Sequence, residues 1–193
     1  MFKFYNAHPE GKRVGDCVKR AICTAAEIDY HEVQLELNRY KKITGCAKYN
    51  DNKNYKQFIE KVLCGIKISF PAVAGEDRMN GERFCEEYPK GKYILRMAGH
   101  LTACVDGKIY DTWDCTDKCV YNAWLIPNKA EREKFTAEAE TKAKTEQANK
   151  EKQKLAVKKI KDKYAKKLKP LQQKIKELEK QMAKELKAVK EVV

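Results

Sequence analysis

The sequence predicts an α+β domain followed by a long helical arm. Apolar residues recur at helical spacing early in the chain, short strand-like runs follow, and residues 129–193 consist almost entirely of good helix formers. Helices and strands that occupy separate parts of a chain are typical of the α+β class. We therefore divide the protein into a domain of residues 1–128 and a Lys/Glu-rich coiled-coil arm of residues 129–193.

The elements of the domain follow from local patterns. Residues 1–5 alternate aromatic residues with Lys and predict a short strand or arm, and residues 6–14 predict a loop. Spacings of three and four predict helices over 17–28, 29–44, 55–63 and 82–88. Alternating or apolar runs predict strands over 66–70, 92–96, 100–105, 108–113 and 120–126.

One hairpin fixes the predicted position of a histidine relative to an aspartate. Asp106-Gly107 separates two strand-like runs and is a strong signal for a two-residue turn. Counting outward from that turn places His100 opposite Trp113. Asp111 then lies diagonally beside His100 on the same face, within hydrogen-bonding reach.

A cysteine opens the first predicted helix. Asp16 is a favourable N-cap, and Cys17 follows in the first turn, where unpaired N–H groups and the helix dipole favour a thiolate. For Cys17 alone, the alternative is a small buried apolar residue. A histidine with a carboxylate behind it is the arrangement that activates a nucleophile, so Cys17, His100 and Asp111 form a candidate catalytic set.

These residues resemble those of papain-like cysteine peptidases. The similar motifs are Gly15-Asp16-Cys17, Gly99-His100 and Asp111-Thr112-Trp113, the last resembling the Asn-Ser-Trp of papain. Asp16-Cys17 is similar to the start of bacteriocin-processing papain-like peptidases, and the whole block resembles small papain-like proteins encoded by tailed bacteriophages. The resemblance covers about residues 1–126 and none of the arm. It implies a thiol protease, with Cys17 as nucleophile, His100 as general acid and base, and Asp111 as the residue that orients His100.

The chain departs from this family at one position. Papain-like enzymes carry an oxyanion-hole Gln six residues before the cysteine, where this chain has Gly11. We expect the Asn6 amide to replace it, together with the backbone N–H of Cys17. Trp113 is expected either to shield the His100–Asp111 bond or to be a core residue. Arg20 is expected to form a helix-surface ion pair with Asp16, with thiolate stabilisation as the alternative.

Three functions follow from this set of residues. The first is hydrolysis of peptide or isopeptide bonds in a protein or peptide substrate. The second is peptidoglycan amidase activity of the CHAP type, which also pairs an early Cys with a Gly-His. The third is a weak or inactive papain-like domain that serves as a binding or virion-assembly module through its coiled coil.

Composition limits partners and location. All eight cysteines lie in residues 1–128 and no secretory signal is visible, so we expect free thiols and a protein that is cytoplasmic or virion-associated. Cys115 and Cys119 lack a second ligand pair, so no metal and no cofactor are predicted. No stretch reaches membrane-spanning length. The arm has a net charge of +10 and the domain +3, but Lys and Glu alternate in the arm, so only nonspecific nucleic-acid binding is expected.

The arm carries one narrow apolar stripe, and Pro170 interrupts it. The spacing of three and four predicts a helix that pairs with another helix through residues 155–193, either in a homo-oligomer or in a partner protein. At Pro170 the helix either kinks or begins a second helix that folds back. The stripe comprises Val157, Ile160, Tyr164, Leu168, Leu171, Ile175, Leu178, Met182, Leu186 and Val189.

Overall fold

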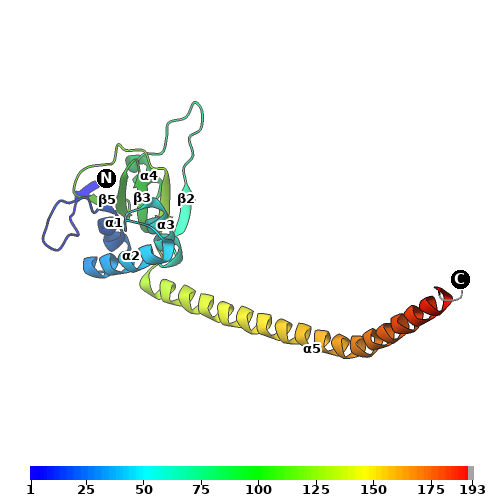
Figure 1. Ribbon diagram of the computed structural model, residues 1–193. Helices are drawn as coiled ribbons and strands as arrows, with labels where there is room; N and C mark the ends of the chain where they lie inside the picture. Colours follow the sequence, from blue (N-terminus) through cyan, green and yellow to red (C-terminus); the bar gives the residue numbers. More distant parts are fainter. Residues whose placement is uncertain (191–193) are drawn as a thin grey trace. The chain divides into compact units, whose positions relative to one another are not determined.

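The computed structural model describes residues 1–190 and contains a six-stranded sheet with helices on both faces (Figure 1). The sheet order is β1-β5-β4-β3-β6-β2, and only the β1–β5 pair is parallel. The strands are β1 (Phe2–Phe4), β2 (Ile66–Ser69), β3 (Lys92–Met97), β4 (His100–Val105), β5 (Lys108–Asp111) and β6 (Asn122–Leu125). The predicted α+β class is confirmed.

Two apolar cores lie on opposite faces of the sheet. Alternation along β3 sends Ile94 into the core shared with α1, α2 and α3, and Leu95 into the core shared with α4. Both side chains are fully buried. The helices are α1 (Cys17–Ala26), α2 (Tyr30–Thr44), α3 (Asn52–Lys61) and α4 (Gly81–Glu87).

The hairpin between β4 and β5 has the predicted register. Val105 pairs with Lys108, and Asp106 and Gly107 have φ values of 46° and 70°. Two consecutive left-handed residues form the turn that matches the twist of an antiparallel pair. The pairing continues through Ala103 opposite Tyr110, as counting from the turn predicts.

Several predicted boundaries are wrong by two or three residues, and side-chain contacts explain two of them. Residues 52–54 were expected in a loop, yet α3 begins at Asn52, because the Asn54 side chain is fully buried and donates to the Tyr49 carbonyl oxygen. This tertiary contact outweighs the low helix propensity of asparagine. Strand β5 ends at Asp111 rather than at residue 113, because the Asp111 carboxylate accepts the Thr112 N–H and turns the chain.

The chain divides into two units, Met1–Thr136 and Ala137–Val193. Helix α5 (Lys129–Lys190) begins in the first unit and continues through Pro170, so the helix does not fold back at that residue. In the first turns of α5, Arg132 donates to the carbonyl oxygens of Pro127 and of Ala26, the last residue of α1.

The apolar stripe of the second unit is exposed. Its described members, from Val157 to Met182, each expose at least half of their surface. The side chains of Leu186 and Val189 lie outside the described residues.

Candidate active site

Cys17 is the first residue of α1 and borders a small cavity. The Asp16 carbonyl oxygen accepts the Arg20 N–H, which begins the helix, so the Cys17 backbone N–H has no intrahelical partner. The cavity has a volume of about 200 Å³, and the Cys17 side chain is half-buried. The cavity is lined by Cys17, Val18, Asn50, Asn52, Tyr55, Arg96, Met97, Gly99, His100 and Leu101.

His100 and Asp111 are hydrogen-bonded to each other at the ends of two adjacent strands. The Nε2 atom of His100 lies 2.7 Å from Oδ2 of Asp111, and both side chains are largely buried. His100 begins β4 and Asp111 ends β5, so the hairpin brings them together as the register predicts. This bond orients the ring and leaves Nδ1 for another partner.

Cys17 and His100 line the same cavity, and His100 lowers the pKa of the Cys17 thiol. Burial raises the pKa of Cys17, but the interactions with His100 and the Leu101 backbone N–H and the charge of Arg20 outweigh it, so the pKa is lowered. Cys23, two turns along the same helix, shows the opposite behaviour. Burial there raises the thiol pKa to about 12. The site therefore favours a thiolate at Cys17 and a neutral thiol at Cys23.

The surroundings of His100 favour its protonated form. Burial lowers its pKa, but the hydrogen bond to Asp111 and the interactions with Cys115 and Cys17 raise it to about 11. The pKa of Asp111 is lowered, because bonds from His100 and Thr102 outweigh the effect of burial. The directions of the three pKa shifts favour a thiolate, an imidazolium and a carboxylate.

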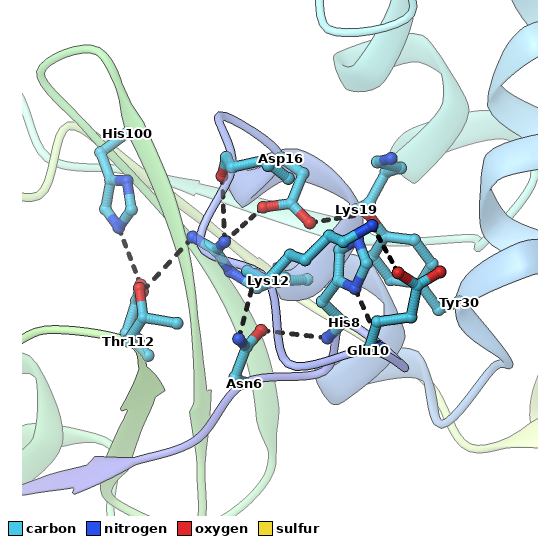
Figure 2. A network of polar contacts seen from close by, with 12 residues as sticks. Asn6, His8, Glu10, Lys12, Asp16, Lys19, Tyr30, His100 and Thr112 are labelled. Carbon is cyan, nitrogen blue, oxygen red and sulfur yellow. Dashed lines mark hydrogen bonds and ion pairs between the residues drawn. The ribbon is translucent and has the colours of Figure 1, made fainter.

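A buried ion-pair network supports Asp111 from behind (Figure 2). Asp16 is buried and binds the Arg20 guanidinium and the Tyr30 hydroxyl, the latter at 2.6 Å. Nη2 of Arg20 lies 3.9 Å from Oδ1 of Asp111. The predicted Arg20–Asp16 ion pair is present, but its predicted location on the helix surface is wrong, because both side chains are buried. The prediction that Asp16 caps α1 is correct for its position but wrong for its side chain, which makes no capping bond.

Asn6 is bound within its own loop. Its Nδ2 donates to the Lys12 carbonyl oxygen at 3.1 Å, and its Oδ1 accepts the His8 N–H at 3.0 Å. Figure 2 shows both bonds, and Asn6 is not among the residues that line the cavity. The Asn6 side chain therefore stabilises its own loop and does not lie where the expected oxyanion donor would be needed. The carboxamides that border the cavity are those of Asn50 and Asn52.

Trp113 lies beside the histidine rather than in the core. Its ring centroid is 5.2 Å from that of His100, and 42% of its surface is exposed. Only 14% of the His100 side chain is exposed. The position agrees with the shielding expectation and excludes the core alternative.

Cys115 is a contact that the sequence did not indicate. It is fully buried, and it contributes to the raised pKa of His100. The possible metal-ligand atoms of His100, Asp111 and Cys115 lie within 4.8 Å of one another. Among the residues that the structure describes, these three form the group that could hold a metal ion. The Asp111 carboxylate is already hydrogen-bonded to His100 and to the Thr112 N–H. These bonds support a role for Asp111 in orienting the His100 ring.

No family model, curated protein or solved structure matches this chain. Within residues 1–190, no helix has the combination of length and apolar composition needed to cross a bilayer.

Proposed function

We propose that this protein is a thiol-dependent hydrolase of the papain-like cysteine peptidase type that cleaves peptide or isopeptide bonds. The observation that carries the proposal is the arrangement of Cys17, His100 and Asp111: Cys17 and His100 line one cavity, and His100 is hydrogen-bonded to Asp111. A nucleophile at a helix N-terminus, a base on one strand and its orienting carboxylate on the next support this chemistry.

The proposed reaction proceeds through a thioester. The Cys17 thiolate attacks the carbonyl carbon, and the Cys17 backbone N–H stabilises the negative oxygen, with the Asn50 and Asn52 amides available as a second donor. The imidazolium of His100 gives its proton to the leaving nitrogen as the C–N bond breaks. His100 then takes a proton from water, which attacks the thioester, releases the acid and restores Cys17. Asp111 keeps the ring of His100 in place throughout.

The first test is the pH dependence of Cys17 alkylation by iodoacetamide. An ordinary thiol has a pKa of about 8.5 and is protonated below neutral pH. The lowered pKa of Cys17 and the raised pKa of His100, about 11, keep the ion pair present between those two values. We therefore expect rapid labelling at Cys17 that persists below pH 7, measured by peptide mass spectrometry.

The controls separate this site from ordinary thiols. Cys17→Ser removes the labelled group, His100→Ala removes its partner, and the other seven cysteines report background reactivity. Reaction of Cys17 no faster than those seven would refute the proposal. Cleavage of purified cell walls but not of peptides would instead assign the site to a CHAP-like amidase.

A non-catalytic papain-like binding module is the second candidate. The observation that favours it is the position of Asn6, whose amide is engaged in its loop and is absent from the cavity. A reactive Cys17 without turnover of any peptide or cell-wall substrate would support this alternative.

A further inference from the structure

An arginine borders the same cavity as the nucleophile. Arg96 lies on β3 opposite Leu101, and the next pair along the two strands joins Met97 to His100. Arg96 and His100 both line the cavity together with Cys17. Arg96 therefore borders the cavity that would receive a scissile bond.

Arg96 is held in place by aromatic residues. Its Nε donates to the Tyr55 hydroxyl at 3.2 Å, and its Cζ lies 5.7 Å from the centre of the Tyr121 ring. Tyr55 is buried and its hydroxyl donates to Asn52, so the support is itself fixed. These contacts engage Nε and one face of the guanidinium. They leave the two terminal nitrogens as donors.

The surroundings of Arg96 are basic. Among residues 1–190 excluding the masked side chains, no carboxylate forms an ion pair with Arg96. Arg78 lies over the same Tyr121 ring, 5.6 Å from its centre. The pKa of Lys56 is lowered by burial and by the charges of Arg96 and Lys67.

Glu60 is an acidic residue that acts on Lys56, and its carboxylate is already hydrogen-bonded. Glu60 raises the pKa of Lys56, which partly offsets the basic neighbours. Its Oε1 accepts the Trp124 indole N–H at 3.0 Å. Among the described side chains, Arg96 thus borders the cavity without a paired carboxylate, so its charge is available to a ligand.

We propose that Arg96 is a specificity residue that binds a substrate carboxylate beside the scissile bond. This inference rests on the proposed function and names its substrate class, an acidic peptide. Two parallel N–H donors match a carboxylate in a bidentate geometry, which a lysine at this position does not reproduce. The carboxylate comes either from an Asp or Glu side chain or from a free C-terminus, and the peptides below distinguish these sources.

The first experiment compares an anionic with a neutral alkylating reagent. Rates of Cys17 labelling by iodoacetate and by iodoacetamide are measured in the full chain and in Arg96→Gln, Arg96→Lys and Arg78→Gln. The His100 charge contributes equally in all four proteins, so the ratio of the two rates isolates the altered side chain. We expect Arg96→Gln to lower the iodoacetate-to-iodoacetamide ratio by up to about fivefold, the size of a partly screened charge pair. Arg78→Gln, the matched control, keeps the ratio.

The second experiment measures binding without turnover. Cys17→Ser protein is titrated with blocked alanine-based peptides containing one Asp, Glu, Asn or Gln, and with an all-Ala peptide ending in a free acid or an amide. We expect an acidic peptide to bind roughly tenfold or more tightly than its amide analogue, as charged hydrogen bonds at partly buried sites do. Adding Arg96→Gln should abolish that difference, and Arg96→Lys should retain only part of it.

The outcomes separate the two proposals. Reactive Cys17 with a ratio and a peptide preference that Arg96→Gln leaves unchanged would overturn the inference and leave the hydrolase proposal standing. Unreactive Cys17 with Arg96-dependent binding of acidic peptides would do the reverse. Thermal unfolding of each variant, compared with Arg96→Lys, shows whether a loss reflects the site or the fold.

Discussion

Asp111 uses its two carboxylate oxygens for different contacts. Oδ2 bonds His100, while Oδ1 accepts the Thr112 N–H at 2.7 Å and faces Arg20. The carboxylate therefore cannot rotate without breaking a bond on both sides. This double anchoring is what a residue that orients a catalytic histidine requires.

Replacing Asp111 by Asn is expected to impair the nucleophile. Loss of the carboxylate lowers the pKa of His100 and raises that of Cys17, because each is stabilised by the charge of the next group. The acidic limb of the iodoacetamide profile should move to higher pH, and kcat for any cleaved peptide should fall by about 10²-fold or more. Alkylation rates between pH 5 and pH 9 measure the shift.

Asp114→Asn is the matched control for this change. Asp114 is an exposed carboxylate three residues along the chain, and it accepts bonds from Thr116 in a turn. Its replacement should leave the alkylation profile unchanged. Equal profiles for wild type and Asp111→Asn would remove Asp111 from the proposed mechanism.

The sequence specifies some of these residue contacts and not others. The His100–Asp111 contact follows from strand pairing, because one turn sets the register of both residues. Arg20 was expected at the surface because helical spacing shows the i,i+4 pair but not what covers it. Asn6 was assigned to the site by its position in the chain, while its own loop satisfies it. Arg96 could have been found by counting outward from the Ala98-Gly99 turn, which places it opposite Leu101.

At the scale of elements, a buried ion pair between Asp16 and Arg20 holds the first turn of α1 in place. Asp16 and Arg20 are one helical turn apart, and their side chains are 2% and 11% exposed. Arg20 also donates to the Val14 carbonyl oxygen at 3.2 Å. The loop before α1, its first turn and the end of β5 are thus joined through one guanidinium, which sets where Cys17 begins the helix.

Arg20→Met is expected to destabilise the protein by about 3–5 kcal/mol, because it leaves the Asp16 carboxylate buried without its cation. The double variant Asp16→Asn with Arg20→Met should recover part of that loss, since no charge then remains buried there. Urea unfolding at pH 7 measures both changes in the free energy of unfolding.

Arg39→Met is the control for an exposed ion pair. Arg39 pairs with Glu36 on the surface of α2 at 2.8 Å. Exposed pairs contribute about 0–1 kcal/mol, so this change should have little effect. A similar loss for Arg20→Met and Arg39→Met would contradict the buried-network interpretation.

Elements were predictable where a local signal starts or stops them. Asp29 accepts the N–H groups of His31 and Glu32 at the start of α2, and Gly45 ends that helix with φ of 68°. The start of α3 is marked less clearly, because the Asp51 side chain at the N-cap position accepts the Lys48 N–H instead of capping the helix, and Asn54 is held by contacts with residues of α2 and of the preceding loop. The parallel pairing of β1 with β5 likewise depends on distant contacts, which local patterns do not encode.

At the scale of the whole molecule, the second unit is helical and exposes its apolar stripe. Leu171 and Ile175 expose 58% and 55% of their surface. Apolar residues at this spacing on an otherwise charged helix favour pairing with another helix. The helix continues through Pro170, so the alternative of a hairpin at that residue does not occur in the described part of the chain. The stripe is therefore not covered by the helix folding back on itself there.

We expect the full chain to form oligomers through this stripe. Sedimentation velocity over a range of concentrations should show a mass above that of the monomer, and Leu171→Lys with Ile175→Lys should restore the monomer. Gln173→Lys, which adds one charge off the stripe, is the control. A monomer at all concentrations would instead assign the stripe to a different partner protein.

The Arg132 contacts described above also determine how a load on the arm would reach the domain. Arg132 donates a hydrogen bond to the last residue of α1, and Cys17 is the first residue of that same helix. Tension applied through the arm would therefore reach α1, the helix that carries the nucleophile, through Arg132, in addition to reaching β6 of the sheet through the backbone of residues 126–128. A fragment that ends at residue 128 would lack Arg132 and its bond to α1, whereas a fragment that ends at residue 136 would retain both.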